Sequence, residues 1–340
     1  MAAAFVQARV PDRVPTLAES RRTAAWLATC VDADGAIGWE RRRHVDAWNH
    51  TESAMALVAF GEDEAADAAY AWLRRTQRPD GTWPMKSTRG VVQDASADSN
   101  QVAYIAVGVW HHWLVRRERE FVEQMWPHVR AALDWVTARQ LDWGGISWNE
   151  AADGKLWETA LLAGSSSIVH SLDCGVLLAD LLGEDGSAWQ RCRDRLAVAV
   201  REHEALFLDN SRYSMDWYYP VLGGALRGDA ARERLDKRWD EFVQPGLGIH
   251  CVNDHPWVTG AETCELALTL DAIGDRDGAM EQIRSIQHLR DPDGAYWTGF
   301  VHAEGVRWPL ERSTWTAAAV LLAIDAVTEH SGGSGIFRLA

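Results

Sequence analysis

Cysteine is scarce in this chain of 340 residues and follows no recognisable spacing. The five cysteines are Cys30, Cys174, Cys192, Cys251 and Cys264. None forms a Cys-x-x-Cys motif, and an odd number does not fit a framework of disulfides. Buried, reduced thiols are the expectation, and they favour a cytoplasmic protein.

Positive charge and long apolar runs are also in short supply. Lys and Arg number 34 against 49 Asp and Glu, a net charge of −15. A nucleic-acid-binding face needs a basic stripe, and the run at 41–43 is short and lies among acids. The first residues lack the pattern of a signal peptide, and no apolar run is long enough to span a bilayer. We therefore expect neither nucleic acid nor membrane as a partner, and the oligomeric state has no signature in the sequence.

Tryptophan, by contrast, is abundant, with 19 residues concentrated in one recurring kind of loop. The two densest copies of this loop span 38–57 and 248–268, and looser copies span 80–100, 145–159, 210–220 and 293–313. Ten tryptophans fall in these loops or directly before them: Trp39, Trp48, Trp83, Trp148, Trp157, Trp217, Trp257, Trp297 and Trp308 lie inside the ranges, and Trp143 lies two residues before the range 145–159. Recurrence at roughly 50 residues is typical of repeat architectures. Indoles gathered in loops predict a surface that stacks on a flat apolar face, such as a sugar ring or an isoprenoid.

The helical periodicity predicts an all-α fold. About twelve segments with helical spacing alternate between amphipathic and almost wholly apolar, and no convincing strand pattern appears. Half-buried and fully buried helices in alternation are what two concentric rings require. We therefore predict an (α/α)6 barrel of six helical hairpins, with residues 1–330 as a single catalytic domain and 331–340 as a flexible C-terminal tail. Because the recurring loops precede the apolar helices, they should gather at one mouth of the barrel.

Acidic residues stand at the start of nearly every predicted inner helix: Asp46, Glu52, Asp94, Asp98, Glu158, Asp216, Glu262, Glu304 and Glu311. Helix capping is one explanation, because a carboxylate in the first turn is stabilised by roughly 0.3–1 kcal/mol. Capping, however, does not require neighbouring Trp and His. A cleft lined by indoles and opposed carboxylates suits glycoside hydrolysis, in which one carboxyl group protonates the leaving oxygen and another activates water or attacks the sugar.

The first and fifth loops are the richest in acid, Trp and His, so we predict Asp46 and Glu262 as the catalytic pair, with Glu158 in reserve. The candidate substrate-binding residues are Trp39, His44, Trp48, Asn49, His50, Asp94, Asp98, Asn100, Trp148, Asn149, Trp157, Asp216, Tyr218, His255, Trp257, Trp308 and Glu311. The sequence does not assign the acid and the base. No His-x-x-x-His or His-Glu-x-x-His spacing occurs, so neither a metal site nor a cofactor is expected.

The hairpin count and the loops resemble the six-hairpin glycosidase superfamily, which includes the glucoamylases. Leu156-Trp157-Glu158 is similar to the Leu-Trp-Glu that carries the general acid of glucoamylases in the third loop, which would make Glu158 the acid. The base motif of that family in the sixth loop is not recognisable, and Glu304 and Glu311 are candidates by position. The whole chain also resembles small actinobacterial hydrolases of methylmannose polysaccharide, which implies an inverting endo-α-mannanase.

Three other functions remain open. The stretches 77–83 and 290–297 resemble the Gln- and Trp-bearing repeats of terpenoid cyclases and prenyltransferases, although Asp94-Ala-Ser-Ala-Asp98 is not the cyclase acid motif, and such turns can also simply brace a hairpin. A sugar epimerase would use histidine pairs, for example His50 with His255 or His302. A non-catalytic sugar-binding module would keep the tryptophans without the surplus of acids.

Overall fold

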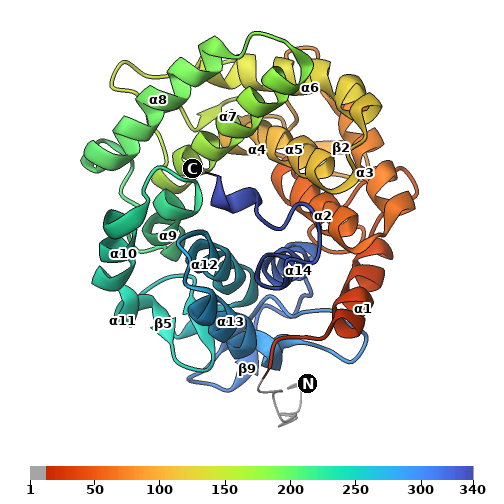
Figure 1. Cartoon of the computed structure of the whole chain (residues 1–340), viewed down its shortest axis with the longest axis vertical. Coiled ribbons are helices and arrows are strands. Elements are labelled where there is room, and N and C mark those ends of the chain that lie inside the picture. The colour runs from red at the N-terminus through yellow and green to blue at the C-terminus, as the bar shows by residue number, and fades with distance from the viewer. Residues whose placement is uncertain (1–12, 340) are drawn as a thin grey trace.

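The computed structural model describes residues 13–339, and they are mainly helical, as predicted. In Figure 1 the helices form a ring, with an inner set next to the centre and an outer set around it. The inner set comprises α2 (Ala47–Phe60), α4 (Ser99–Ala103), α5 (Ile105–Arg116), α7 (Leu162–Leu182), α9 (Ser214–Leu222), α12 (Gly260–Ala272) and α14 (Thr314–Thr328). The outer set comprises α1 (Leu17–Ala28), α3 (Asp63–Thr76), α6 (Arg119–Thr137), α8 (Ser187–Glu202), α10 (Gly228–Lys237) and α13 (Arg276–Ser285).

The composition of each helix explains its layer. In α14 every residue from Thr314 to Val327 is buried, because an apolar helix needs protein on all sides. In the outer helix α3 the buried residues are Ala66, Ala69, Tyr70, Trp72 and Leu73, which recur at three-to-four spacing and leave the charged face in water. The alternation in the sequence therefore reports the two layers.

The inner helices pack on one another in chain order. α2 contacts α5, α5 contacts α7, α7 contacts α9, α9 contacts α12, α12 contacts α14, and α14 contacts α2. Each inner helix also packs against an outer neighbour, as α2 does on α3 and α12 on α13. The recurring loops therefore lie where an outer helix leads into the next inner one.

A tight Asp-Gly turn recurs after the outer helices and joins neighbouring hairpins. Gly35 has φ +88°, and a Cβ there would lie 2.2 Å from the carbonyl oxygen of Ala68 in α3. At Gly294, with φ +96°, a Cβ would lie 2.8 Å from the carbonyl oxygen of Arg22 in α1. Only glycine tolerates both the left-handed backbone and the close approach. The last such turn thus rests on the first helix of the chain.

These turns also explain the Gln-bearing repeats that resemble those of terpenoid enzymes. Gln77 donates from Nε2 to the carbonyl oxygens of Gly81 and His128, each at 2.9 Å. Gln140 does the same to Gly144 at 3.0 Å and Cys192 at 2.9 Å. Each glutamine therefore braces its turn against the next outer helix. This structural role accounts for the repeat without terpenoid chemistry.

Short strands in the loops were missed in the prediction. β1 (Lys86–Thr88) pairs with β2 (Val91–Asp94), and β3 (Ala97–Asp98) with β4 (Asn149–Glu150). A five-stranded antiparallel sheet holds β5 (Val243–Gln244), β6 (Gly248–His250), β7 (Trp257–Thr259), β8 (Gly299–Val301) and β9 (Val306–Arg307). Strands of two to four residues are too short for an alternating pattern to stand out. The remaining short elements are α11 (Trp239–Phe242), η1 (Glu204–Leu206), η2 (Ile286–Leu289) and η3 (Ile336–Arg338).

The C-terminal segment is packed, so the expectation of a flexible tail was wrong for residues 331–339. Ile336 and Phe337 are 2% and 7% exposed. Arg338 donates from Nε and Nη2 to the carboxylate of Asp271 at 2.7 and 3.0 Å. Figure 1 shows this segment crossing the centre of the ring. Asp271 lies at the C-terminal end of α12, so the segment covers the end of the ring away from the recurring loops.

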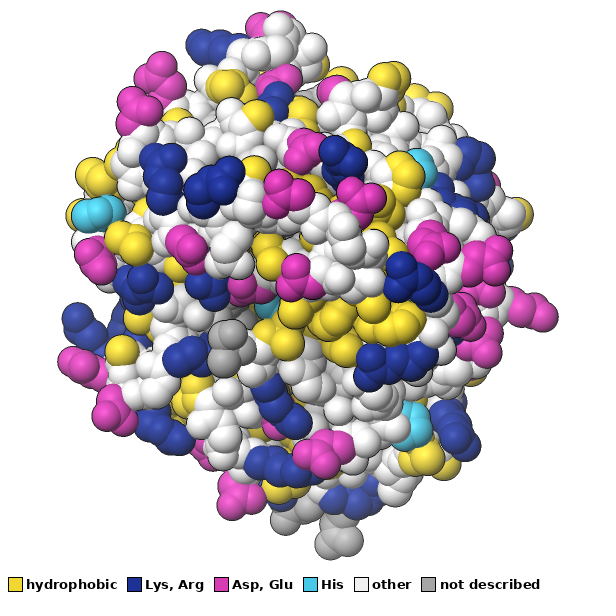
Figure 2. All heavy atoms as spheres, turned by 45° about the horizontal axis from the view of Figure 1, so that its top comes forward, with side chains coloured by type: hydrophobic (Ala, Val, Ile, Leu, Met, Phe, Trp, Pro, Cys, Tyr) yellow, Lys and Arg dark blue, Asp and Glu magenta, His cyan; other side chains and the backbone are white. Residues whose placement is uncertain are grey.

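Two surface properties bear on partners. Among the described residues α7 has the length and composition to cross a membrane, contrary to the expectation, but 72% of its apolar window is buried inside the protein, as is common for a core helix. On the face in Figure 2, acidic and basic side chains are intermingled.

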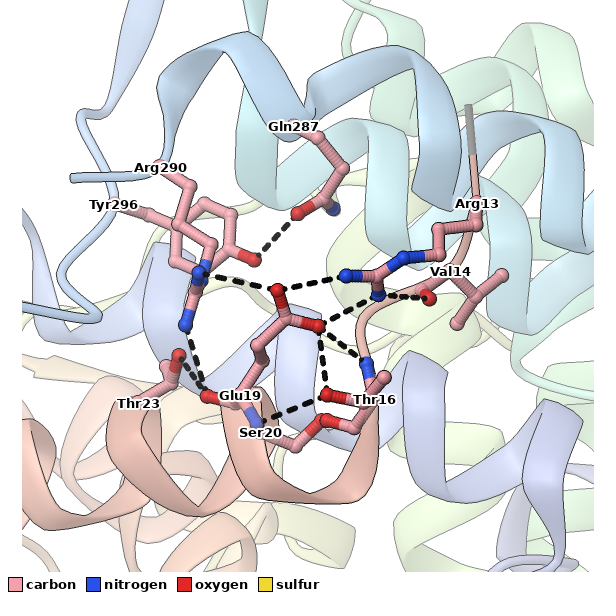
Figure 3. A network of polar contacts seen from close by, with 9 residues as sticks. All are labelled: Arg13, Val14, Thr16, Glu19, Ser20, Thr23, Gln287, Arg290 and Tyr296. Atoms are coloured by element: carbon pink, nitrogen blue, oxygen red, sulfur yellow. Dashed lines mark hydrogen bonds and ion pairs between the residues drawn. The ribbon is translucent and has the colours of Figure 1, made fainter. Parts of the chain in front are cut away.

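The start of the described chain is fixed to the ring by a polar network (Figure 3). Thr16 and Glu19 form a capping box at the start of α1, and Glu19 also receives two bonds from Arg13, at 2.6 and 3.0 Å. Arg290 donates to the carbonyl oxygen of Glu19 at 3.0 Å. The first outer helix is thereby held to the turn that follows α13.

Candidate active site

The six recurring loops are hydrogen-bonded to one another at the N-terminal ends of the inner helices. One bond between each successive pair is enough to show the arrangement: Val45 N to Ser87 O (2.7 Å), Ser99 N to Trp148 O (3.0 Å), Ala163 N to Asp216 Oδ1 (3.1 Å), Ser214 N to Cys251 O (2.9 Å), Gly260 N to Thr298 O (3.0 Å) and Thr314 N to Trp39 O (2.9 Å). Residues far apart in the sequence are thus assembled at one end of the ring. We call this end the mouth.

Asp46 and Asp98 lie at the mouth, close enough for the charge of Asp46 to act on Asp98. Asp46 caps α2 by accepting from Asn49 N at 2.8 Å, and Asp98 caps α4 by accepting from Gln101 N at 3.0 Å. Capping is therefore real for both, as the alternative explanation held. Burial nevertheless raises the pKa of each to about 6, and the charge of Asp46 further raises the pKa of Asp98. Asp46 is thus a carboxyl group able to hold or release a proton near neutral pH.

Glu262 lies in the first turn of α12 and is 4% exposed. Burial raises its pKa, and the neighbouring side chains of Thr259 and Cys251 oppose that rise. Its Oε2 has no hydrogen-bond partner among residues 13–339. A buried carboxylate oxygen without a partner is costly in a purely structural role.

A second pair of buried acids, Glu52 and Glu265, lies deeper in the ring. Tyr219 Oη donates to Glu265 Oε1 at 2.8 Å, and Tyr218 Oη donates to Oε2 of the same residue. Both acids line a small central cavity together with Tyr104. Burial and mutual repulsion raise the pKa of Glu52, and burial raises that of Glu265. Glu265 was not predicted, although a glutamate inside the apolar run Cys264–Leu268 was a signal for it.

This deeper pair connects the two predicted catalytic acids. The charge of Asp46 contributes to the raised pKa of Glu52, and the charge of Glu262 contributes to that of Glu265. None of these four carboxylates forms an ion pair with a described basic residue. The mouth and the space beneath it therefore form one acidic, largely desolvated region.

Aromatic rings form a wall beside Asp46. Trp48 lies 5.2 Å from Tyr104 and 5.7 Å from Trp315, measured between ring centroids. Trp39 lies 5.5 Å from Trp315 and stacks on His44 at 5.9 Å. Trp315 was not predicted, although it lies in the first turn of the last apolar helix, α14. The wall offers the flat apolar faces that pyranose rings stack on.

Three polar groups in the recurring loops lack a hydrogen-bond partner. Trp48 Nε1, Asn100 Oδ1 and Trp148 Nε1 are buried and make no hydrogen bond to a described residue. Glu311 accepts from Trp39 Nε1 at 2.9 Å and from Thr298 Oγ1 at 3.2 Å, so it supports the wall. Buried polar groups are normally satisfied, so unsatisfied ones in a cleft indicate a ligand.

Two further pairs of tryptophans lie at the rim. Trp157 and Trp308 are each 51% exposed. Trp148 backs Trp157 at 5.4 Å, and Trp257 backs Trp308 at 4.9 Å while donating from Nε1 to the carbonyl oxygen of Trp308 at 2.8 Å. Glu158, next to Trp157, is exposed.

Some predicted substrate-binding residues have structural roles instead. His50 is fully buried, with Nδ1 accepting from Ile37 N at 3.0 Å and Nε2 bonded to the carbonyl oxygen of Ala69 at 2.9 Å, so it cannot bind sugar or move a proton for an epimerase. Tyr218 is fully buried and bonded to Glu265. Asp94 is exposed in a hairpin, where it accepts from Ser96 N and Oγ.

Other predicted residues lie at the mouth but in anchoring or exposed positions. Asp216 accepts from Ala163 N and thereby links two loops. Asn49 donates to Thr314 Oγ1 at 3.3 Å, and Asn149 is buried in β4. His255 is exposed and bonded to Asp254 at 2.8 Å, and Glu304 is exposed in the turn between β8 and β9. Within residues 13–339, no three His, Cys, Asp or Glu side chains are placed to hold a metal ion.

Solved structures with this fold include glycosidases and a D-mannose isomerase. A glycosidase in complex with glucose superposes with a TM-score of 0.74 at 16% identity, covering 96% of this chain and 99% of that one. A D-mannose isomerase superposes with a TM-score of 0.70 at 12% identity, covering 96% and 100%. An α-amylase from Clostridium perfringens gives a TM-score of 0.66 at 10% identity, covering 91% and 98%. At these identities the likeness shows the fold alone.

The helical barrel-like fold and the acid-lined, indole-walled mouth define a glycoside hydrolase. No family model matches the chain. The chain is, however, 53% identical over 325 residues to the MMP endo-(1,4)-3-O-methyl-alpha-D-mannosidase of Mycolicibacterium hassiacum, which covers 96% of this chain and 90% of the relative. It therefore belongs to the family of that mannosidase, and the resemblance noted in the sequence is confirmed.

Proposed function

We propose that this enzyme hydrolyses internal α-linkages of a methylmannose polysaccharide. The observation that carries the proposal is the 53% identity over 96% of the chain to an enzyme whose name states that activity. The site supports it independently, because an uncharged polysaccharide needs stacking surfaces and hydrogen bonds rather than counter-charges. The mouth supplies both in Trp48, Trp315 and the unpartnered groups beside them.

Asp46 and Glu262 carry the reaction in this proposal. One carboxyl group protonates the glycosidic oxygen and the other carboxylate activates a water molecule. General acid–base catalysis works best when the pKa of the group lies near the working pH. Burial raises the pKa of Asp46 to about 6 and raises that of Glu262, and no basic side chain among residues 13–339 is paired with either. Inversion at the anomeric carbon is what the family resemblance implies, and Glu158 stays in reserve.

The ring of helix contacts supports a closed (α/α)6 barrel. The order of contacts returns from α14 to α2, and the loop bonds return from the sixth loop to the first. Closure brings Asp46, from the first loop, and Glu262, from the fifth, to the same mouth. Hydrolysis with two carboxylates requires that the two acids reach the same glycosidic bond from this mouth.

The cytoplasm is the compartment we propose for the enzyme. All five cysteines are free thiols, and Cys30, Cys174, Cys192 and Cys264 are buried. A reducing compartment keeps such thiols unpaired. Localisation of a tagged chain in its own cells tests this point.

The proposed activity is tested by incubating the protein with defined oligomers of α-(1,4)-linked 3-O-methylmannose, unmethylated α-mannans and α-glucans. Internal fragments from the methylated mannan alone are the expected result, and the anomer formed first distinguishes inversion from retention. Cleavage of none of these polymers, or of α-glucan in preference, would overturn the proposed function.

A further inference from the structure

The two rim tryptophans Trp157 and Trp308 occupy opposite sides of the mouth. The inner helices follow one another round the ring as α2, α5, α7, α9, α12 and α14. Trp157 lies in the loop before α7, the third of these helices, and Trp308 lies in the loop before α14, the sixth. Three places in a ring of six is half a turn. The catalytic candidates Asp46 and Glu262, from the first and fifth loops, therefore lie between these two positions.

Both tryptophans are built alike. Each is 51% exposed and leans on a second, less exposed indole, Trp148 at 5.4 Å and Trp257 at 4.9 Å. The bond from Trp257 Nε1 to the carbonyl oxygen of Trp308 fixes the backbone that carries the outer ring. Half-exposed indoles are expensive to keep in water, and a rigid support lowers the entropic cost of binding through them.

Exposed apolar groups concentrate at the same end of the molecule. Except for Leu17 and Val198, every large hydrophobic side chain that is exposed among residues 13–339 lies in a loop that leads into an inner helix. Leu156 and Leu310 flank the two tryptophans in this way, at 42% and 71% exposure. A sugar whose hydroxyl carries a methyl group presents a more apolar face than a free sugar does. The rim therefore matches a methylated chain better than an unmethylated one.

We propose that Trp157 and Trp308 are the outer sugar-binding platforms at the two ends of a cleft that crosses the mouth, one for each side of the bond that is cut. This inference rests on the proposed function, and it names the residues that direct cleavage to internal linkages. A long chain is held at both ends, so the cut falls within it. An oligomer too short to reach a platform gains nothing from that indole.

The test uses Trp157→Ala and Trp308→Ala in the full-length enzyme, with long and short 3-O-methylmannose oligomers labelled at the reducing end. Each substitution should raise KM for the long oligomer about tenfold, equivalent to the loss of about 1.4 kcal/mol of apolar contact, with little change in kcat. KM for the shortest oligomer that is still cut should stay within about twofold, since the lost contact is worth little there. The two variants should also shift the position of the cut along the labelled chain in opposite directions.

Val198→Ala, on the exposed face of the outer helix α8, is the matched control and should leave the fragment pattern unchanged. Equal losses on long and short oligomers, an unaltered fragment pattern, or shifts in the same direction would each overturn the assignment of platforms while the proposed function stands. A wild-type enzyme that cuts none of the methylated oligomers would overturn both.

Discussion

The two ends of α12 carry buried acids in opposite electrostatic settings. At the mouth, Glu262 is 4% exposed, has no ion-pair partner among the described residues and leaves Oε2 without a hydrogen bond. At the far end, Asp271 is 7% exposed but receives two bonds from Arg338, at 2.7 and 3.0 Å. One helix therefore holds a neutralised acid at one end and an unneutralised acid at the other.

The same difference separates the mouth from the outer layer. Arg116 pairs with both Asp63 and Asp67 at 2.6 Å, whereas Asp46 and Glu52 pair with no described basic residue. Burying an acid without a counter-charge costs stability, and perturbed acids of this kind gather at functional sites. The acids at the mouth lack counter-charges because they serve chemistry, whereas those of the outer layer and of the far end serve stability.

The largest effect should follow removal of the mouth acids. Glu262→Gln and Asp46→Asn should each lower kcat by about 10²–10⁴ while the free energy of unfolding is not reduced, because a buried charge is removed and Asn still caps α2. Steady-state kinetics and urea denaturation measure the two quantities. Asp271→Asn is the matched change at the other end of α12 and should leave kcat unchanged. A near-normal kcat in either mouth variant would remove that residue from the catalytic pair. A collapse of kcat in Glu158→Gln would bring Glu158 into the pair.

The next largest effect should come from breaking the pair at the far end. Arg338→Met leaves Asp271 buried without its partner and should lower the free energy of unfolding by about 1–3 kcal/mol, with kcat/KM unchanged. Urea unfolding checks the stability. The double variant Arg338→Met with Asp271→Asn should recover part of the loss, because no charge is then left unpaired. A loss of activity at unchanged stability would show that the far end takes part in catalysis.

The smallest effect concerns pH. The folded state holds a proton on Asp46 up to about pH 6, whereas an ordinary aspartate, with a pKa of 3.8, loses it near pH 4. The contribution of Asp46 to stability therefore falls as pH rises from about 4 to about 6. Asp46→Asn does not titrate, so its Tm should match the wild type near pH 4 and exceed it by about 2 °C or more near pH 7. A constant difference in Tm across this range would show that Asp46 is not desolvated in the fold.

The sequence was enough to predict the helical layers but not the strands. Burial period is a property of many residues, so the wholly buried α14 and the one-sided α3 could be distinguished in advance. The strands are two to four residues long and exist because neighbouring loops pair, as β3 does with β4, and such pairing depends on tertiary contact. The C-terminal segment was misjudged for the same reason. Its glycines suggested a tail, but the cavity that receives Phe337 is made by other helices.

At the site, the sequence could propose acids but not their surroundings. Asp46 and Glu262 stood out because Trp and His lie close to them in the sequence. Glu265 could be recognised only from its spatial neighbours Tyr218 and Tyr219. His50 was misassigned because nothing in its local sequence reveals that both ring nitrogens bond to backbone. Whether a polar side chain is free or already engaged is decided by partners distant in sequence.

The packed C-terminal segment turns the ring into a well with a floor. Phe337 stacks on His170 at 5.1 Å and lines the central cavity, while Arg338 and Arg227 tie its backbone and its neighbours to the surrounding helices. A polymer therefore has no tunnel to be drawn through. The polymer must bind across the mouth, and both products of cleavage must leave through the same mouth.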